Sequence, residues 1–187
     1  MPSIAAHMAV AKKVGENLNI YNEDFIRGNL LPDLYEDKTA SHYKKQGTFF
    51  LIPDMELAEN SLDLNNYQDL GYYVHLLVDL YYLEDFLAKK APNIDVFEER
   101  IIYKDYDNIN IDIVKHFNLD VPYIINVLSK YNIKVDKRKL DKNIECLSIT
   151  SIGPTKYLKN PEFPVFLDNI SLKISEDIKK FVKNDDR

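Results

Sequence analysis

The stretch from Gly71 to Lys90, GYYVHLLVDLYYLEDFLAKK, constrains the fold more than any other part of the chain. Between Leu70 and Leu83 nearly every side chain is apolar or aromatic, and only His75 and Asp79 interrupt the pattern. A helix that is hydrophobic on all sides belongs in the middle of a domain rather than on its surface. The sequence therefore predicts a buried helix at the centre of the molecule.

The rest of the chain predicts further helices around this one, and hence an all-α, compact multi-helix bundle. The central helix is expected from about Asn66 to Lys90, where Pro92 closes it. Near the N-terminus, Ser3 is a candidate cap, Gly15 a candidate stop, and Pro32 a candidate end for the second helix. The other expected helices are Ser3–Lys13, Glu23–Leu31, Val96–Phe117 with a break near Asp107-Asn108, Pro122–Tyr131, Arg138–Leu147 and Ser171–Lys183.

A long segment without an obvious pattern, Leu34–Asn66, precedes the central helix. Loops of this length are uncommon in compact domains and often carry function. The 187 residues suit a single helical domain. Its motifs fall within about residues 1–90, and residues 150–187 are interpreted as a peripheral C-terminal extension.

Composition excludes several functional classes. The net charge of −6 argues against a general nucleic-acid binder, which usually carries a basic face. The lysines of Lys134–Lys142 alternate with acids and are interpreted as a solvent-exposed face. A single cysteine, Cys146, excludes an internal disulfide and a zinc site built from cysteines. No leader peptide or membrane span is recognised, so a cytoplasmic location without integral membrane contact is expected.

His75 and Asp79 stand four residues apart, so their side chains lie on one face of the central helix. Burying an imidazole and a carboxylate is costly unless they form a hydrogen bond or share a metal ion. Two alternatives follow, a structural hydrogen bond or a metal site. Mixed histidine and carboxylate ligands suit zinc, manganese or iron, and they leave room for an activated water.

Three further residues could complete such a site. His7 lies in the first helix, and Asp33 and His42 flank the start of the irregular segment. Each also has a structural interpretation: Asp33 as a turn former or cap, His42 as a solvated loop residue, and His7 as a packing residue. Their combination with the central helix favours the metal interpretation over any single residue considered alone.

These residues resemble those of the zinc-dependent phospholipase C family, whose superfamily includes single-strand-specific nucleases. The likeness covers roughly the first half of the chain. It is carried by Pro2-Ser3-Ile4-Ala5-Ala6-His7 with Ala11, Gly28-Asn29-Leu30-Leu31-Pro32-Asp33, His42-Tyr43, and Gly71-Tyr72-Tyr73-Val74-His75-Leu76-Leu77-Val78-Asp79.

The resemblance implies a metal-dependent hydrolase that acts on a small phosphate-containing substrate through a metal-activated water. It implies that Asp33, His42, His75 and Asp79 surround one ion. Asp79 would bridge toward a second ion, which His7 would help to hold.

The chain departs from the family pattern in two places. Secreted members use an N-terminal Trp amine as a ligand, whereas this chain begins with Met1 and contains no Trp. Asp85 stands where the first histidine for a third ion is expected, and no later His-x-x-x-Glu follows. The prediction is therefore one or two ions, zinc first, with manganese or iron as alternatives. Asp54 and Asp85 are candidates for a general base.

Two other functions stay open at this point. The chain could be a non-catalytic helical binding or structural protein that keeps a partial metal site. A helical phosphohydrolase of the His-Asp type would require an adjacent His-Asp dipeptide, and the sequence contains none. The sequence predicts no sequence-specific nucleic-acid contact, and it leaves the oligomeric state and the substrate undetermined.

Overall fold

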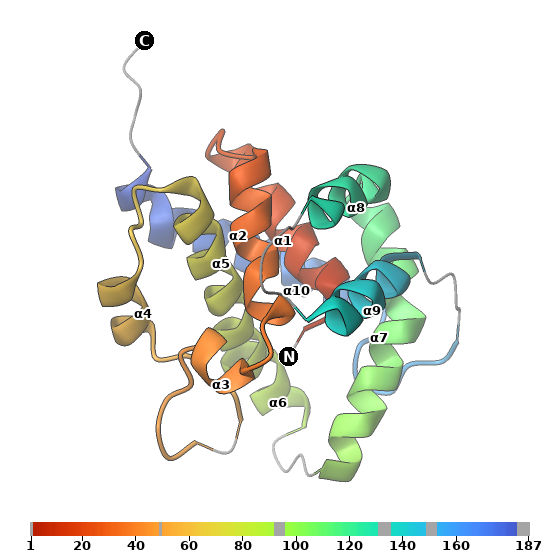
Figure 1. The fold of residues 1–187 in the computed structure, drawn as a ribbon. Helices are drawn as coiled ribbons and strands as arrows, with labels where there is room; N and C mark the ends of the chain where they lie inside the picture. Colours follow the sequence, from red (N-terminus) through yellow and green to blue (C-terminus); the bar gives the residue numbers. More distant parts are fainter. Residues whose placement is uncertain (1, 49, 92–95, 131–135, 149–152, 183–187) are drawn as a thin grey trace.

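Helices form the framework of the molecule, and the computed structural model describes residues 2–48, 50–91, 96–130, 136–148 and 153–182 (Figure 1). The described residues form no strand, only one isolated bridge between Lys44 and Pro53. The prediction of an all-α, compact fold is confirmed. The helices are α1 (Ile4–Asn17), α2 (Glu23–Leu34), α3 (Lys38–Ser41), α4 (Met55–Ser61), α5 (Tyr67–Tyr81), a π-helical segment (Tyr82–Leu87), α6 (Ala88–Lys90), α7 (Val96–His116), α8 (Val121–Ser129), α9 (Lys137–Ser148) and α10 (Glu162–Ile178), followed by a 3₁₀ turn (Lys179–Phe181).

The central helix is α5, continued without interruption by the π-helical segment and α6. Asn66 caps its N-terminus, because the Asn66 side chain accepts hydrogen bonds from the amides of Gln68 and Asp69. Every residue from Leu70 to Asp79 is buried, as predicted for the middle of the bundle. Pro92, the predicted end of this helix, lies outside the described residues.

Two glycines let α2 and α5 pack with their backbones in contact. A Cβ atom added at Gly28 would lie 1.7 Å from the carbonyl oxygen of Gln68. A Cβ atom added at Gly71 would lie 2.0 Å from the carbonyl oxygen of Phe25. No other residue fits at either position without moving the helices apart, so these glycines set the distance between the two elements.

The prediction that Pro32 ends the second helix is wrong. Helix α2 runs through Pro32 to Leu34, which places Asp33 inside the last turn. Proline removes only one backbone hydrogen bond this close to a C-terminus. Leu31, Pro32 and Leu34 are all buried, and this packing stabilises the final turn. The Ser41 hydroxyl donates a hydrogen bond to the Pro32 carbonyl at 2.9 Å.

The first helix also extends beyond its predicted end, because Gly15 lies within α1 rather than after it. Its role is close approach: a Cβ atom at Gly15 would lie 2.7 Å from the Cβ atom of Tyr21. The cap prediction for Ser3 is confirmed, since its hydroxyl accepts from the Ala6 amide at 3.3 Å and donates to Asn110 at 2.6 Å.

The segment predicted to be irregular, Leu34–Asn66, contains the short helices α3 and α4. The Asp37 side chain caps α3, and the Asp54 side chain caps α4. The Lys44–Pro53 bridge joins the chain between these two helices. Local capping, rather than hydrophobic periodicity, forms these helices, which explains why the apolar pattern does not reveal them.

The C-terminal half belongs to the core. Helix α7 is not broken at Asp107-Asn108. Helix α10 begins at Glu162, nine residues before the predicted Ser171, and packs against α1. The interpretation of residues 150–187 as a peripheral extension therefore misses the contribution of α10. Its buried apolar side chains are Phe163, Leu167, Ile170, Ile174 and Ile178.

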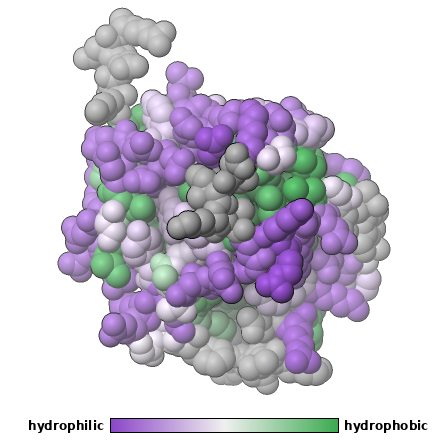
Figure 2. All heavy atoms as spheres, in the orientation of Figure 1, coloured by the Kyte–Doolittle hydropathy of each residue, from purple (hydrophilic) through white to green (hydrophobic). Residues whose placement is uncertain are grey.

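The surface agrees with a bundle that buries its apolar side chains, since the face shown in Figure 2 is mainly hydrophilic. Among the described residues, we find no helix with both the length and the apolar character needed to cross a membrane.

Candidate metal centre

Five side chains from separate parts of the N-terminal half meet in the interior beside α5. They are the five predicted metal ligands: His7 on α1, Asp33 on α2, His42 immediately after α3, and His75 and Asp79 on α5. Two groups of donor atoms have spacings that could hold a metal ion. One group is His7, His75 and Asp79, and the other is Asp33, His42 and His75, with donor atoms within 4.8 Å of one another.

The distances between donor atoms suit coordination better than direct hydrogen bonding. The Nε2 atoms of His42 and His75 are 3.3 Å apart, and Asp79 Oδ2 lies 3.5 Å from His75 Nε2 and 3.7 Å from His42 Nε2. Asp33 Oδ1 lies 3.7 Å from His42 Nε2. Ligand bonds of about 2.0–2.2 Å in a tetrahedral zinc site separate neighbouring donors by about 3.3–3.6 Å. The observed spacings lie close to this range.

Backbone carbonyls determine which nitrogen of each histidine carries the proton. His75 Nδ1 lies 2.8 Å from the carbonyl oxygen of Asn29, and His42 Nδ1 lies 3.0 Å from that of Lys38. The Ser41 hydroxyl oxygen also lies 3.0 Å from His42 Nδ1. A carbonyl can only accept, so in the neutral imidazoles Nδ1 holds the proton and Nε2 carries a free lone pair. The two Nε2 atoms therefore face each other as acceptors, in the arrangement that metal-binding histidines share.

Asp79 presents a charged group with no compensating donor. Both of its carboxylate oxygens are buried, and neither has a hydrogen-bond partner in the described part of the chain. Oδ2 faces His42 and His75, while Oδ1 faces His7 Nε2 at 3.5 Å. Burying a carboxylate without a partner costs on the order of several kcal/mol. A cation between these atoms would remove that cost, whereas a structural hydrogen bond from His75 would require a proton on Nε2.

The charge states follow from burial. Burial lowers the pKa of His7, His42 and His75 to about 4 each, so all three imidazoles are neutral at pH 7. Burial raises the pKa of Asp79, because a carboxylate is poorly solvated there. Burial would likewise raise the pKa of Asp33, but the opposing influence of His75 and Lys38 is larger and lowers it.

These pKa values predict how metal binding responds to acid. A histidine binds a metal only when the nitrogen is unprotonated, and an ordinary imidazole is protonated as the pH falls through about 6.5. Because burial lowers these pKa values to about 4, we expect bound metal to be retained at pH 5.5 and lost toward pH 4. Metal content after dialysis at stepped pH, with circular dichroism to monitor folding, measures this. Loss of half the metal near pH 6.5 from folded protein would contradict it.

The two candidate general bases do not join this cluster. Asp54 caps α4, where Oδ1 accepts a hydrogen bond from the Leu57 amide at 3.1 Å. Asp85 lies at the surface on the π-helical segment and forms ion pairs with Lys173 at 3.2 Å and Lys89 at 3.9 Å. Both carboxylates already have structural partners.

Several residues that support the ligands are not identified by sequence reasoning. Asn29 holds His75 through a backbone carbonyl, which side-chain identity cannot reveal. The buried hydroxyl of Tyr72 donates a hydrogen bond to the Ser41 carbonyl beside His42. Lys38 pairs with Asp33 through its ammonium group. A spacing signal for Asn29 does exist, since it lies one helical turn before Asp33.

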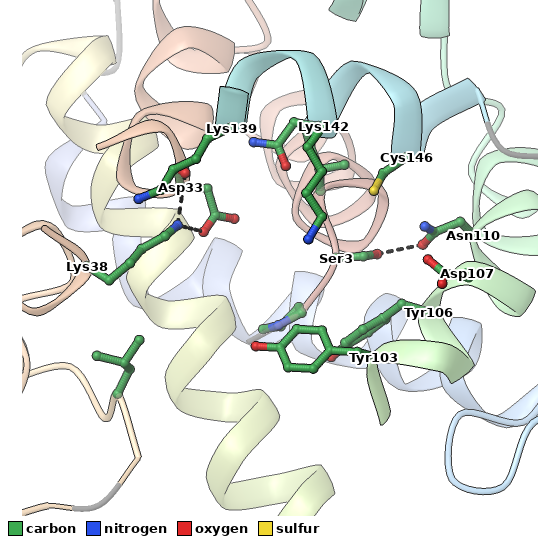
Figure 3. A pocket seen from close by; sticks show the side chains of 14 residues that line it. Ser3, Asp33, Lys38, Tyr103, Tyr106, Asp107, Asn110, Lys139, Lys142 and Cys146 are labelled. Carbon is green, nitrogen blue, oxygen red and sulfur yellow. Dashed lines mark hydrogen bonds and ion pairs between the residues drawn. The ribbon is translucent and has the colours of Figure 1, made fainter. Parts of the chain in front are cut away.

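A pocket of about 440 Å³ opens beside the cluster (Figure 3). Asp33 and Lys38 lie on one side of it, and Tyr103 and Asn110 of α7 lie on the other. Asp33 thus lines the pocket and also belongs to one of the two groups of donor atoms that could hold a metal ion. A volume of this size admits a small organic molecule.

Comparisons of the chain with family models, with curated proteins and with solved structures give no match in any of the three.

Proposed function

We propose that this chain is a metal-dependent hydrolase of a phosphate ester. The observation that carries the proposal is the convergence of two histidine lone pairs on the unpaired, buried carboxylate of Asp79. Zinc suits the mixed nitrogen and oxygen donors best, with manganese and iron as alternatives. A bound ion would supply a Lewis acid for phosphate oxygens and an activated water.

The residues of the chain have distinct roles in this proposal. Asp33, His42, His75 and Asp79 hold the principal ion. Asp79 has one oxygen on each side of the cluster, so it can bridge to a neighbouring ion beside His7. The preference for a phosphate ester rests on the family resemblance of these ligands and on the cationic Lys38 at the pocket. The ammonium of Lys38 pairs with Asp33, so its positive charge lies beside the ligands of the principal ion.

We propose no more than two metal ions at this site. The ion pairs of Asp85 with Lys89 and Lys173 occupy the carboxylate that stands in place of a distal ligand. A third ion would have to displace two ammonium groups from it.

Hydrolysis of simple chromogenic esters tests this function. Metal-loaded protein is incubated with p-nitrophenyl phosphate and bis(p-nitrophenyl) phosphate, and release of p-nitrophenolate is followed by absorbance. We expect turnover of at least one ester, at least about 100-fold lower after chelation and in His75→Ala. His116→Ala is the matched control, because His116 lies outside the cluster and pairs with Asp168 at 2.7 Å. Turnover that survives both chelation and His75→Ala would refute the proposal.

A second candidate function is favoured by the positions of Asp54 and Asp85. Both potential bases are engaged elsewhere, one as a helix cap and the other in ion pairs. This is the arrangement expected of a non-catalytic helical protein that retains a metal site. Stoichiometric metal binding without turnover of any phosphate ester would favour this alternative.

A further inference from the structure

The pocket beside the cluster has a second cationic wall, which is formed by α9. Lys139 and Lys142 of this helix line the pocket together with Lys38 (Figure 3). Lys142 is exposed, as expected for a solvent-exposed face, whereas Lys139 is half-buried, and both border the pocket. Three ammonium groups around one pocket are notable in a chain whose net charge is −6.

Hydrogen bonds fix this wall against the helix that carries Asp33. The Lys139 ammonium donates to the carbonyl oxygens of Tyr35 and Glu36, which directly follow α2. The Asp136 amide, just before α9, donates to the Leu34 carbonyl at 3.1 Å. Helix α9 is thus anchored at the end of α2, so its lysines keep a fixed position relative to the metal-binding carboxylate.

Lys142 differs from the other two lysines because its charge is available. Lys38 is paired with Asp33, and Lys139 is bound to carbonyls. Within the described residues, no hydrogen bond or ion pair engages the Lys142 ammonium, and its side chain extends from α9 into the pocket (Figure 3). Asp107 is the other carboxylate lining the pocket, and it lies on the α7 side beside Asn110.

The remaining walls suit the carbon skeleton of a small molecule. Tyr103 presents an aromatic ring from α7, and Leu51 and Cys146 add further apolar surface. A ligand that spans the pocket from Asp33 to the Lys142 ammonium would lie within this lining. The Lys142 ammonium projects from α9 between the side with Asp33 and Lys38 and the side with Asn110 and Asp107 (Figure 3).

We propose that Lys142 is a specificity-determining residue that binds a second anionic group of the substrate. This inference rests on the proposed function. The substrate class is a small organic phosphate ester that carries another anionic group, either a carboxylate or a second phosphate. The ester phosphate lies at the metal centre, and the second group accepts hydrogen bonds from the Lys142 ammonium.

Cys146 provides a test that does not depend on turnover. It is the only cysteine of the chain and it lines the same pocket, so a bound ligand should slow its reaction with iodoacetamide. Burial raises the pKa of the Cys146 thiol, so the reaction is followed at pH 8.5, where enough thiolate forms. The probes are 3-phosphoglycerate and glycerol 3-phosphate, which share a three-carbon skeleton. Only 3-phosphoglycerate carries a second anionic group, its carboxylate.

We expect 3-phosphoglycerate to protect Cys146 of the metal-loaded protein at a concentration at least about fivefold lower than glycerol 3-phosphate does. This preference should disappear in Lys142→Gln and persist in Lys142→Arg. Lys137→Gln is the matched control, because Lys137 is an exposed lysine of the same helix that does not line the pocket. Inorganic phosphate and 2,3-bisphosphoglycerate extend the comparison to one and two phosphate groups.

The outcomes separate the two proposals. An equal preference in wild type and Lys142→Gln, with metal binding and ester hydrolysis intact, would overturn the role of Lys142 and leave the proposed function standing. Absence of protection by both 3-phosphoglycerate and 2,3-bisphosphoglycerate, the probes with two anionic groups, would also overturn that role. A preference that depends on Lys142 in protein that binds metal but hydrolyses no ester would support the anion site and refute the hydrolase.

Discussion

Asp79→Asn is expected to abolish metal binding while it stabilises the metal-free protein. The amide keeps the shape of the side chain but removes the charge that a cation would neutralise. In the absence of metal, wild type carries a buried carboxylate without hydrogen-bond donors in the described part of the chain, and burial raises the pKa of this group. A neutral amide costs less to bury, so we expect a gain of about 1–3 kcal/mol in unfolding free energy.

The measurement combines elemental analysis with thermal unfolding, on protein purified without chelators. Wild type should hold near-stoichiometric metal, and its melting temperature should fall when a chelator is added. Asp79→Asn should hold essentially none, and its melting temperature should be insensitive to the chelator and above that of metal-free wild type. His75→Ala should also lose the metal, because His75 belongs to both groups of donor atoms.

The direction of the change in stability of the metal-free protein distinguishes a metal site from an internal hydrogen-bond network. If Asp79 served as a structural acceptor for His75, the amide would weaken that contact and lower the stability of metal-free protein. A lower melting temperature for Asp79→Asn than for metal-free wild type would therefore contradict the metal interpretation. Asp168→Asn is a matched control, because Asp168 pairs with a histidine at the surface, away from the cluster.

His75 and Asp79 stand out in the sequence as candidate ligands because their chemistry conflicts with their surroundings. His75 and Asp79 are polar groups in an otherwise apolar helix, so burial requires them to have a partner. Asp54 and Asp85 show no such conflict. In the structure Asp54 caps a helix and Asp85 forms ion pairs. Candidates that are chosen only for residue type and proximity in sequence lack this constraint.

Supporting contacts are less predictable because they depend on tertiary packing. The carbonyl of Asn29 reaches His75 only because α2 lies against α5, and no side-chain pattern reports a backbone acceptor. Lys142 reaches the pocket because α9 is anchored beside α2, while its sequence context resembles that of any exposed, charged helix. Helix ends at Gly15 and Pro32 are mispredicted for a related reason, since packing overrides local propensity.

Gly71→Ala should destabilise the protein strongly, although alanine is the better helix former. Helix propensity alone favours the substitution by about 1 kcal/mol. The new Cβ atom would lie 2.0 Å from the Phe25 carbonyl oxygen and 3.0 Å from the Asn29 amide nitrogen, both backbone atoms that cannot rotate away. Overpacking of this kind costs about 1–3 kcal/mol, and more when backbones must separate, so we expect a net loss of about 3 kcal/mol.

Urea denaturation with and without metal measures this loss, and Gly47→Ala provides the control. Gly47 has a φ of 76° but open space around its Cβ position, so backbone strain of about 1–2 kcal/mol is its expected cost. An unchanged unfolding midpoint for Gly71→Ala would show that the two helices are not held in backbone contact.

The same substitution should also weaken metal binding, because the glycine contact positions a ligand. Asn29 follows Gly28 on α2, and its carbonyl accepts the His75 Nδ1 proton at 2.8 Å while its side chain donates to the Gly71 carbonyl at 3.3 Å. Separating α2 from α5 removes these bonds and frees the orientation of His75. Loss of such a supporting contact lowers metal affinity about 10–100-fold. Stability and metal affinity should therefore fall together in Gly71→Ala, whereas Asp79→Asn should lose the metal and gain stability without it.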